Sequence, residues 1–265
     1  MRHVTRPVIT LTTDFGLTDH FAGTMKGVIL SICPQTQIVD ISHQVRNFDV
    51  AEAGVLIAQA YPYFPPGTVH IVVVDPGVGS SRRPILAEAN GHLFIAPDNG
   101  VLSTIVGTRE HKVRWITEEK YFHHPVSRTF HGRDIFAPVG AHLAAGVLAS
   151  RFGRRIDDYL CLASEIPVRT ARRAWTGTIL KIDQFGNLLT NFRASDFPRI
   201  DSEPFEMRAG LRAISRVAAS YAELNIGELC VIAGSSGYLE IAANQASAAK
   251  ILGCGTGAPV ELKLL

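Results

Sequence analysis

The first 75 residues alternate between strand-like and helix-like segments, and this alternation constrains the fold more than any other feature. Strands are expected over 7–13, 37–42 and 68–74, and helices over 21–33 and 49–61. The third strand is apolar almost throughout, which is typical of a strand that is buried on both faces. Strands and helices in alternation predict βαβ units, and therefore a mostly parallel sheet covered by helices.

The alternation stops after the third strand. Asn90 and Gly91 stand between two apolar runs and predict a type I′ hairpin. A further strand is expected over 112–117 and a helix over 134–145. Beyond about residue 172 the chain is rich in strands and turns, with a single helix expected over 244–252.

We therefore predict an α/β fold in two domains. Residues 1–168 are expected to form an N-terminal α/β domain with a mostly parallel sheet, and residues 169–265 a smaller C-terminal β-barrel domain. The composition agrees, because 46% hydrophobic and 19% charged residues over a chain of 265 can bury a substantial core.

Charge and cysteine content exclude several classes of protein. A net charge of +2 without a basic stripe does not predict a nucleic-acid partner. No run approaches the roughly 18 apolar residues of a membrane span. The four cysteines form no CxxC pair and are expected to be reduced. With no leader-like segment at the start, we expect a cytoplasmic protein.

Polar residues follow the apolar strands at four places. They are Asp14, the pair Ser42 and His43, Asp75, and the pair Asp98 and Asn99. In an open α/β sheet, ligands bind outside the carboxyl ends of the strands. A single Asp in such a place is more often a turn or helix cap, but four such ends together predict a ligand site at this edge.

Two loops carry the residues with the clearest chemistry. In the segment DPGVGSSRRP, Arg82 can hold the Asp75 carboxylate ionised, and Gly79 is expected to let the backbone approach a ligand closely. In FHGRD, His131 is the candidate proton handler. The neighbouring Arg133 and Asp134 are expected to pair with each other, with Asp134 capping the following helix.

The second domain gives weaker indications. Asp183 and Asn187 surround Gly186 in DQFGNLLTN, where they can be turn formers, although the Asn187 carboxamide could also bind a base edge. The chain has no GxGxxG after its first strand, no P-loop, no HExxH and no GxSxG. Standard dinucleotide, P-loop, zincin and serine-hydrolase chemistry are therefore disfavoured.

Seven motifs in order resemble a known family. They are TTDFG (12–16), SICP (31–34), VVVDPGVG (72–79), IAPDNG (95–100), TFHGRDIFAP (129–138), IDQFGNLLTN (182–191) and SSGYLEIA (235–242). Over essentially the whole chain, the sequence resembles the S-adenosyl-L-methionine (SAM) hydroxide adenosyltransferases. These adenosine-forming SAM hydrolases are relatives of the SAM-dependent fluorinase and chlorinase.

The resemblance implies a hydrolase that converts SAM to adenosine and L-methionine by attack of water or hydroxide on the ribose C5′. It also implies a homotrimer in which SAM lies between the first domain of one subunit and the second domain of its neighbour. No metal and no cofactor are needed, since SAM is the substrate.

The resemblance also assigns site residues. Asp75, Arg82 and His131 match the catalytic set near the attacking water. The remaining matches bind substrate: Asp14 at the ribose hydroxyls, Phe48 over the ribose, Phe130 beside the attack site, Asp19, Asp183 and Ser235 at the methionine end, and Asn187 and Tyr221 at adenine.

Departures from the halogenase pattern favour water as the nucleophile. The fluorinase has Tyr in place of Asp75, and Phe-Tyr-Ser in place of Phe130, His131 and Gly132. A fixed carboxylate repels a halide and attracts a water proton. Pairing with Arg82 is expected to lower the pKa of Asp75, which would make it a weak base that mainly orients the water.

Three alternatives stay open from the sequence. The first is a non-catalytic module that binds SAM or adenosine, which would not require the catalytic set. The second is a metal-dependent hydrolase with Asp14, Asp75, Asp98 and His131 as ligands. The third is a SAM-dependent halogenase, which the departures above disfavour.

Overall fold

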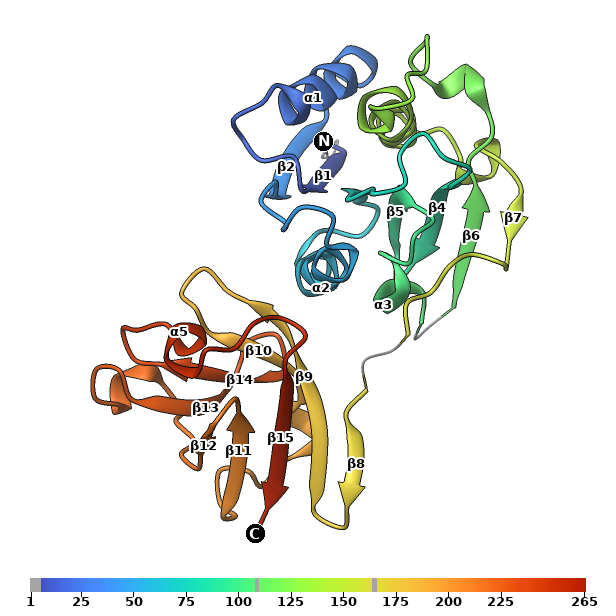
Figure 1. The fold of residues 1–265 in the computed structure, drawn as a ribbon. Coiled ribbons are helices and arrows are strands. Elements are labelled where there is room, and N and C mark those ends of the chain that lie inside the picture. Colours follow the sequence, from blue (N-terminus) through green and yellow to red (C-terminus); the bar gives the residue numbers. More distant parts are fainter. Residues whose placement is uncertain (1–5, 108–109, 164–165) are drawn as a thin grey trace, which may run out of the picture. The chain divides into compact units, whose positions relative to one another are not determined.

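The structure is a computed structural model that describes residues 6–107, 110–163 and 166–265. The chain divides into two compact units, with the boundary between residues 163 and 164. The first unit contains a sheet flanked by helices, and the second consists mainly of strands (Figure 1).

The sheet of the first unit has seven strands in the order β2-β1-β3-β5-β4-β6-β7. The strands are β1 (Val8–Thr13), β2 (Gln37–Ser42), β3 (Val69–Val73), β4 (Pro84–Ala89), β5 (His92–Pro97), β6 (His111–Trp115) and β7 (Arg155–Ile156). The pairs β1–β2, β1–β3 and β3–β5 are parallel, whereas β4 pairs antiparallel with β5 and β6, and β6 with β7. The α/β class is confirmed, and the sheet is mixed.

In the described part of this unit, four α-helices and several shorter helical turns accompany the sheet. The α-helices are α1 (Phe21–Ile32), α2 (Val50–Ala60), α3 (Ser103–Val106) and α4 (Ala137–Ala144). The shorter elements are η1 (Tyr61–Tyr63), η2 (Glu119–Tyr121), η4 (Ala149–Arg151) and the π-helical turn η3 (Gly132–Phe136). Local sequence explains the ends of two of the helices. α1 ends before Pro34, and Asp49 caps α2 by accepting a hydrogen bond from the Glu52 amide at 2.8 Å.

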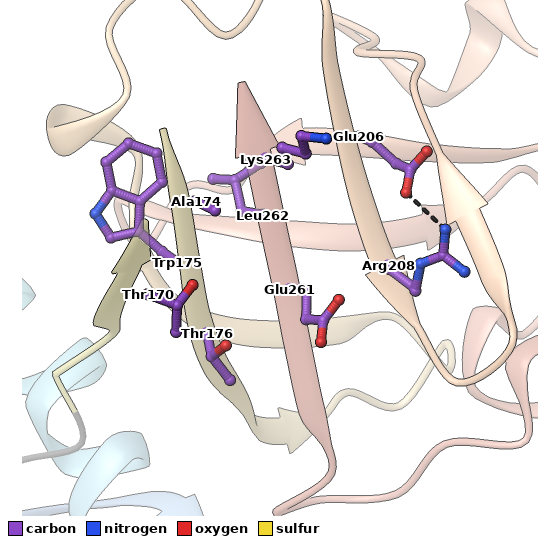
Figure 2. Close-up of a pocket in the computed structure, with 9 residues that line it drawn as sticks. All are labelled: Thr170, Ala174, Trp175, Thr176, Glu206, Arg208, Glu261, Leu262 and Lys263. Carbon is purple, nitrogen blue, oxygen red and sulfur yellow. Dashed lines mark hydrogen bonds and ion pairs between the residues drawn. The ribbon is translucent and has the colours of Figure 1, made fainter. Parts of the chain in front are cut away.

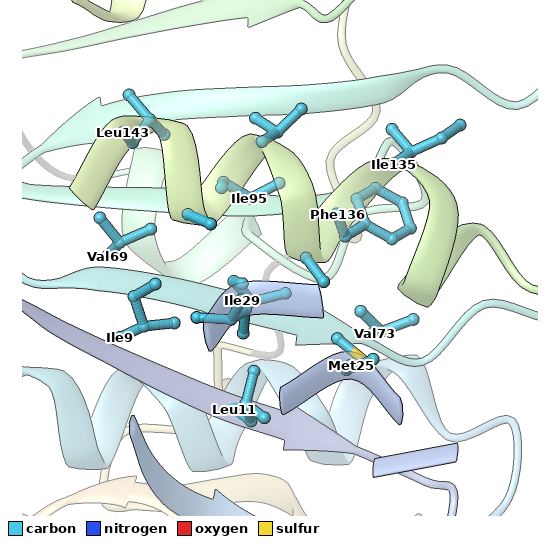
Figure 3. Close-up of a cluster of buried hydrophobic side chains, with 14 of the residues drawn as sticks. Ile9, Leu11, Met25, Ile29, Val69, Val73, Ile95, Ile135, Phe136 and Leu143 are labelled. Atoms are coloured by element: carbon cyan, nitrogen blue, oxygen red, sulfur yellow. The ribbon is translucent and has the colours of Figure 1, made fainter. Parts of the chain in front are cut away.

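Both faces of the sheet are covered, as the apolar β3 predicted. Val69, Ile71 and Val73 pack in one core with α1 and α4 (Figure 3). Val72, on the opposite face of the strand, packs in a second core with α2 and α3. The alternation of side chains along a strand therefore divides β3 between two apolar layers.

The predicted hairpin is confirmed between β4 and β5. Asn90 and Gly91 have φ values of 53° and 78°, as a type I′ turn requires at its two central residues. The helix predicted over 134–145 instead starts earlier, because the π-helical turn η3 precedes α4 and runs directly into it.

The second unit is a nearly closed, antiparallel, barrel-like sheet. Its strands are β8 (Val168–Ala171), β9 (Ala174–Ile182), β10 (Leu188–Arg193), β11 (Phe205–Ala209), β12 (Arg212–Ile214), β13 (Leu229–Ala233), β14 (Tyr238–Ala243) and β15 (Pro259–Leu264). They follow the order β12-β11-β15-β9-β10-β14-β13, with β8 paired to β9. The shorter elements η5 (Ala194–Asp196) and η6 (Tyr221–Glu223) connect strands.

The helix of the second unit is shorter than expected. The sequence predicted a helix over 244–252, but α5 covers only Ala248–Leu252. Gln245 has a left-handed φ of 52°, and Ala243 bridges to Ala246 in a tight turn. The helix begins only after this turn, where Ser247 caps it by accepting a hydrogen bond from the Lys250 amide. Among the described residues, no helix is long and apolar enough to cross a membrane.

Candidate active site

A cavity of about 270 Å³ opens at the carboxyl ends of the parallel strands in the first unit. Strands β1 and β3 are neighbours, with Thr13 opposite Val73, so Asp14 and Asp75 leave the same edge of the sheet. The residues that line the cavity are Asp14, Phe15, Phe21, Asn47, Phe48, Val73, Asp75, Val78, Thr129, Phe130, His131 and Gly132. The edge predicted from topology therefore carries a cavity in this structure.

Asp75, Arg82 and His131 form one hydrogen-bonded group. The Arg82 Nε donates to Asp75 Oδ1 at 3.0 Å, and its Nη2 donates to Asp75 Oδ2. The same Nη2 lies 3.1 Å from His131 Nδ1. The Arg82 and Asp75 side chains are only 7% and 5% exposed, so this fork-shaped ion pair is almost dry.

The electrostatics of Asp75 differ from the expectation. The neighbouring Arg82 was expected to lower the pKa of this carboxyl. Burial raises the pKa of Asp75 above its ordinary value, and the attraction of Arg82 only partly offsets that effect. Asp75 is therefore a better proton acceptor than the sequence suggested.

The protonation of His131 follows from its partner. A guanidinium has only donors, so His131 Nδ1 must accept the bond from Arg82, and its proton is on Nε2. Burial and the positive charge of Arg82 both lower the pKa of His131. His131 is thus a neutral imidazole at physiological pH and presents an N–H donor at Nε2.

A glycine brings the two loops of this group together. Gly79 has a φ of 76°, and a Cβ there would overlap the carbonyl oxygen of Arg128. We expected Gly79 to let the backbone approach a ligand, but the close approach is to the segment that leads to His131. This contact packs the loop that carries Asp75 and Arg82 against the loop that carries His131.

Asp14 joins the loops that follow β1 and β2. Its Oδ2 accepts a hydrogen bond from the Phe48 amide at 2.9 Å. Phe48 has a φ of 69°, uncommon for a residue with a Cβ, and its side chain is 69% exposed. Phe130 is buried at the cavity wall, where its ring packs edge-on against Phe15 and Phe21.

Asp98 does not join the other strand-end carboxylates. Arg83 donates to it from Nε at 2.9 Å, and the Leu160 amide donates to its Oδ1 at 2.7 Å. The Asn99 side chain is likewise bonded within the protein, because its Nδ2 donates a hydrogen bond to the Val74 carbonyl. The metal-ligand set drawn from Asp14, Asp75, Asp98 and His131 is therefore not assembled, and within the described ranges no three His, Cys, Asp or Glu side chains form a candidate metal site.

The pair Arg133 and Asp134 forms as expected, with Nε and Oδ1 at 2.5 Å. The expected cap is wrong, because Asp134 lies inside η3. Its carboxylate accepts instead from the Ser127 amide at 2.8 Å, and this bond holds the loop that precedes His131. The reason is that the helical turn starts at Gly132, so Asp134 is its third residue and His131 holds the cap position.

Two of the predicted residues of the second unit, Asp183 and Asn187, share hydrogen bonds on the barrel. Asp183 accepts from the amides of Phe185 and Asn187 at 2.9 and 2.8 Å and from the Asn187 side chain at 2.9 Å. Burial and the negative charges of Glu240 and Asp183 raise the pKa of Tyr221. Burial and Asp183 also raise the pKa of Glu240.

Two predicted residues lie apart from these groups. Ser235 is exposed at the turn between β13 and β14, and Asp19 is exposed on the loop before α1 and does not line the cavity. Conversely, sequence reasoning missed Asn47 in the cavity and Glu240 on the barrel. Asn47 stands beside the predicted Phe48, and Glu240 stands within the motif SSGYLEIA. Neither an Asn nor a Glu in these places has a spacing or motif that would single it out.

A second hollow of about 260 Å³ lies on the face of β9, β11 and β15 (Figure 2). It is lined by Thr170, Ala174, Trp175, Thr176, Glu206, Arg208, Glu261, Leu262 and Lys263. Arg208 donates to Glu206 at 2.7 Å, so these two charges neutralise each other. None of the predicted site residues belongs to this hollow.

Comparison with known proteins identifies both units. The model of the SAM hydroxide adenosyltransferase N-terminal domain matches residues 9–153, and the model of the C-terminal domain of the same family matches residues 177–261. A curated protein from Salinispora tropica, named (R)-S-adenosyl-L-methionine hydrolase, is 36% identical over 95% of both chains. One from Methanocaldococcus jannaschii with the same name is 34% identical over 95% of this chain and 94% of its own.

A more distant relative and a solved structure also match nearly the whole chain. A fluorinase from Nocardia brasiliensis is 29% identical over 98% of this chain and 97% of its own. The crystal structure of an uncharacterized conserved protein from Thermotoga maritima superposes with a TM-score of 0.91, at 37% identity over 96% of this chain and 99% of that one. With both domain models matched in order over most of its length, the chain belongs to the SAM hydroxide adenosyltransferase family.

Proposed function

We propose that this protein hydrolyses SAM to adenosine and L-methionine, with water as the nucleophile at the ribose C5′. The observation that carries the proposal is the buried group of Asp75, Arg82 and His131, two members of which line the cavity. The names of the relatives from Salinispora tropica and Methanocaldococcus jannaschii support the same reaction.

The reaction needs an oriented water more than an acid. The water oxygen forms a bond to C5′ while the bond from C5′ to sulfur breaks. Its electron pair stays on sulfur, so methionine leaves as a neutral thioether and one proton is released. The leaving group requires no protonation, whereas water is a poor nucleophile that must be held in line and relieved of its proton.

The geometry supports different roles for Asp75 and His131, which both line the cavity. The Nε2–H of His131, which the Ser127 carbonyl also attracts, can donate to the water oxygen. Asp75 is the anionic acceptor, because its carboxylate keeps lone pairs beyond its bonds to Arg82 and to the Gly77 amide. Arg82 orients both groups and keeps His131 in the tautomer that donates.

Arg82 has a further donor that its bonds to Asp75 and His131 do not use. Its Nη1 is buried and has no hydrogen-bond partner among the described residues. A buried donor of this kind is normally satisfied by water or by a bound group. We propose that a water or a substrate atom bonds there during the reaction.

The same carboxylate disfavours halide as the nucleophile. An ionised Asp75 in a nearly dry setting would repel an anion strongly. Among the described residues that line the cavity there is no Lys or Arg, and the nearby Arg82 is already neutralised by Asp75. We therefore place this chain with the hydrolases of its family. We propose that it requires neither a metal nor a cofactor, since a sulfonium carbon is already activated.

We propose that the rest of the substrate is held by Asp14, Phe48 and Phe130 in the cavity and by the barrel residues Asp183 and Asn187. Asp19, Tyr221 and Ser235 complete this proposed set. A cavity of about 270 Å³ is at the lower limit for drug-sized ligands, which supports a site that needs further walls. We accordingly propose a homotrimer with sites shared between subunits, which light scattering of the purified protein can test.

We also propose a cytoplasmic location. All four cysteines are free, and Cys161 is exposed, which fits a reducing compartment. The proposed partner is the small-molecule substrate SAM. We propose neither a nucleic acid nor a membrane as a partner.

The test is a product assay. Purified, chelator-treated protein is incubated with SAM, with and without excess chloride, and the nucleosides are separated by chromatography. We expect adenosine and methionine in equal amounts, unaffected by chloride. Retention of intact SAM would indicate a binding module instead. Loss of activity that returns with added divalent metal would indicate a metallohydrolase, and a 5′-chloro product a halogenase.

A further inference from the structure

Strand β1 carries two buried threonines that each share a hydrogen bond with a buried histidine. Thr10 Oγ1 lies 2.7 Å from His70 Nδ1, and Thr13 Oγ1 lies 2.8 Å from His43 Nδ1. All four residues are at most 3% exposed. The two pairs are chemically alike, yet only Thr13 stands at the end of the strand where the cavity opens.

The His43 pair continues into the loop that follows β1. Thr13 Oγ1 accepts a hydrogen bond from the Phe15 amide at 3.2 Å and shares a second hydrogen bond with His43 Nδ1. His43 Nε2 lies 3.0 Å from Asp40 Oδ1. The backbone oxygen of His43 also accepts from the Gly16 amide at 2.7 Å.

His43 therefore holds the loop at two points, through Thr13 to Phe15 and through its own carbonyl to Gly16. Asp14, which with Phe15 lines the cavity, lies between Thr13 and these two amides. His43 itself does not line the cavity.

We propose that His43 and Thr13 are positioning residues that hold the wall formed by Asp14 and Phe15 in the shape that binds substrate. The role in substrate binding rests on the function proposed above. Asp75, Arg82 and His131 are held to one another by their own hydrogen bonds, and these do not pass through His43. Loss of the pair should thus weaken binding and leave the chemical step largely intact.

The two pairs on β1 provide a matched control. Thr13→Val and Thr10→Val each replace a buried hydroxyl by a methyl group of similar size beside a histidine. For Thr13→Val we expect a KM for SAM about tenfold higher, the factor equivalent to one lost hydrogen bond, with kcat within about threefold. For Thr10→Val we expect unchanged KM, although both variants lose stability. Thr13→Ser retains the hydroxyl and should restore KM.

Amide hydrogen exchange gives a second readout that needs no substrate. In the peptide that contains Phe15 and Gly16, exchange should be faster in Thr13→Val and His43→Gln and unchanged in Thr10→Val and His70→Gln. If wild-type protein fails to hydrolyse SAM but this pattern holds, the proposed function fails and the loop-holding role stands.

Three results would overturn the proposal. One is unchanged exchange of the loop peptide in both Thr13→Val and His43→Gln. Another is an equal rise in KM for Thr10→Val and Thr13→Val, which would indicate a general effect of destabilising β1. The third is that both Thr13→Val and His43→Gln fail to fold while Thr10→Val folds, which would make the pair a support of the fold and not of the site.

Discussion

Two adjacent arginines, each paired with a buried aspartate, allow catalysis to be separated from stability. Arg82 pairs with Asp75, whose side chain is 5% exposed, and Arg83 pairs with Asp98, whose side chain is 3% exposed. Removing one partner of a buried ion pair leaves the other charge uncompensated, which costs about 3 kcal/mol or more. For a unit of this size, that loss corresponds to a melting temperature roughly 6–12 °C lower.

Asp75→Asn should therefore destabilise the protein by about this amount, and Asp98→Asn by less, because Arg83 keeps its ion pair with Asp158 at 3.0 Å. Only Asp75→Asn removes the proposed proton acceptor, so its kcat should fall on the order of 100-fold or more, with little change in KM. Asp98→Asn should keep kcat close to wild type at a temperature where both variants are folded.

The assay combines thermal unfolding with initial rates of adenosine release over a range of SAM concentrations. The reasoning fails if Asp98→Asn loses as much turnover as Asp75→Asn, because the loss would then follow from disturbed packing. It also fails if Asp75→Asn turns over at the wild-type rate.

Two further predictions concern pH. Activity should fall as acid protonates Asp75, and because burial raises the pKa of Asp75, this limb should lie above the ordinary range of aspartate. His131→Gln should lower kcat but keep the acidic limb of the pH–rate profile. If the variant loses that limb, the titrating group is His131 and not Asp75. For stability, desolvation and His92 lower the pKa of His70 to about 3. The unfolded chain therefore binds a proton below about pH 6.5 that the folded protein does not, and stability is lost as pH falls from there toward 3. Denaturant unfolding should show this site costing about 2 kcal/mol at pH 5 relative to pH 7, and a drop of the same size in His70→Gln would contradict the assignment.

Much of the fold could be predicted because its determinants are local. The apolar run that became β3, the Asn90-Gly91 pair and the N-cap Asp49 each specify a conformation from a few neighbouring residues. Helix ends were predicted less well, because local backbone conformations that the hydrophobic pattern does not reveal determine where the helices begin. The left-handed backbone of Gln245 delays the start of α5. The π-helical turn η3 makes the helical segment after His131 begin at Gly132, before the predicted start at residue 134.

The candidate site was harder to predict because its properties depend on which distant residues meet. Strand topology predicted that Asp14 and Asp75 would share an edge, but not that Arg83 would draw Asp98 away from it. The direction of the Asp75 pKa shift depends on burial, which no short segment reveals. Glu240 is close to Asp183 only because β14 pairs with β10, so its sequence context gave no indication of this.

The central claim is that water attacks the ribose C5′, and hydrolysis in ¹⁸O-labelled water tests it most directly. We expect mass spectrometry to find one ¹⁸O atom per adenosine, located at the 5′ hydroxyl, and none in methionine. Unlabelled adenosine, or free adenine with the label on the ribose C1′, would contradict the account, because the bond broken would then not be the one between C5′ and sulfur.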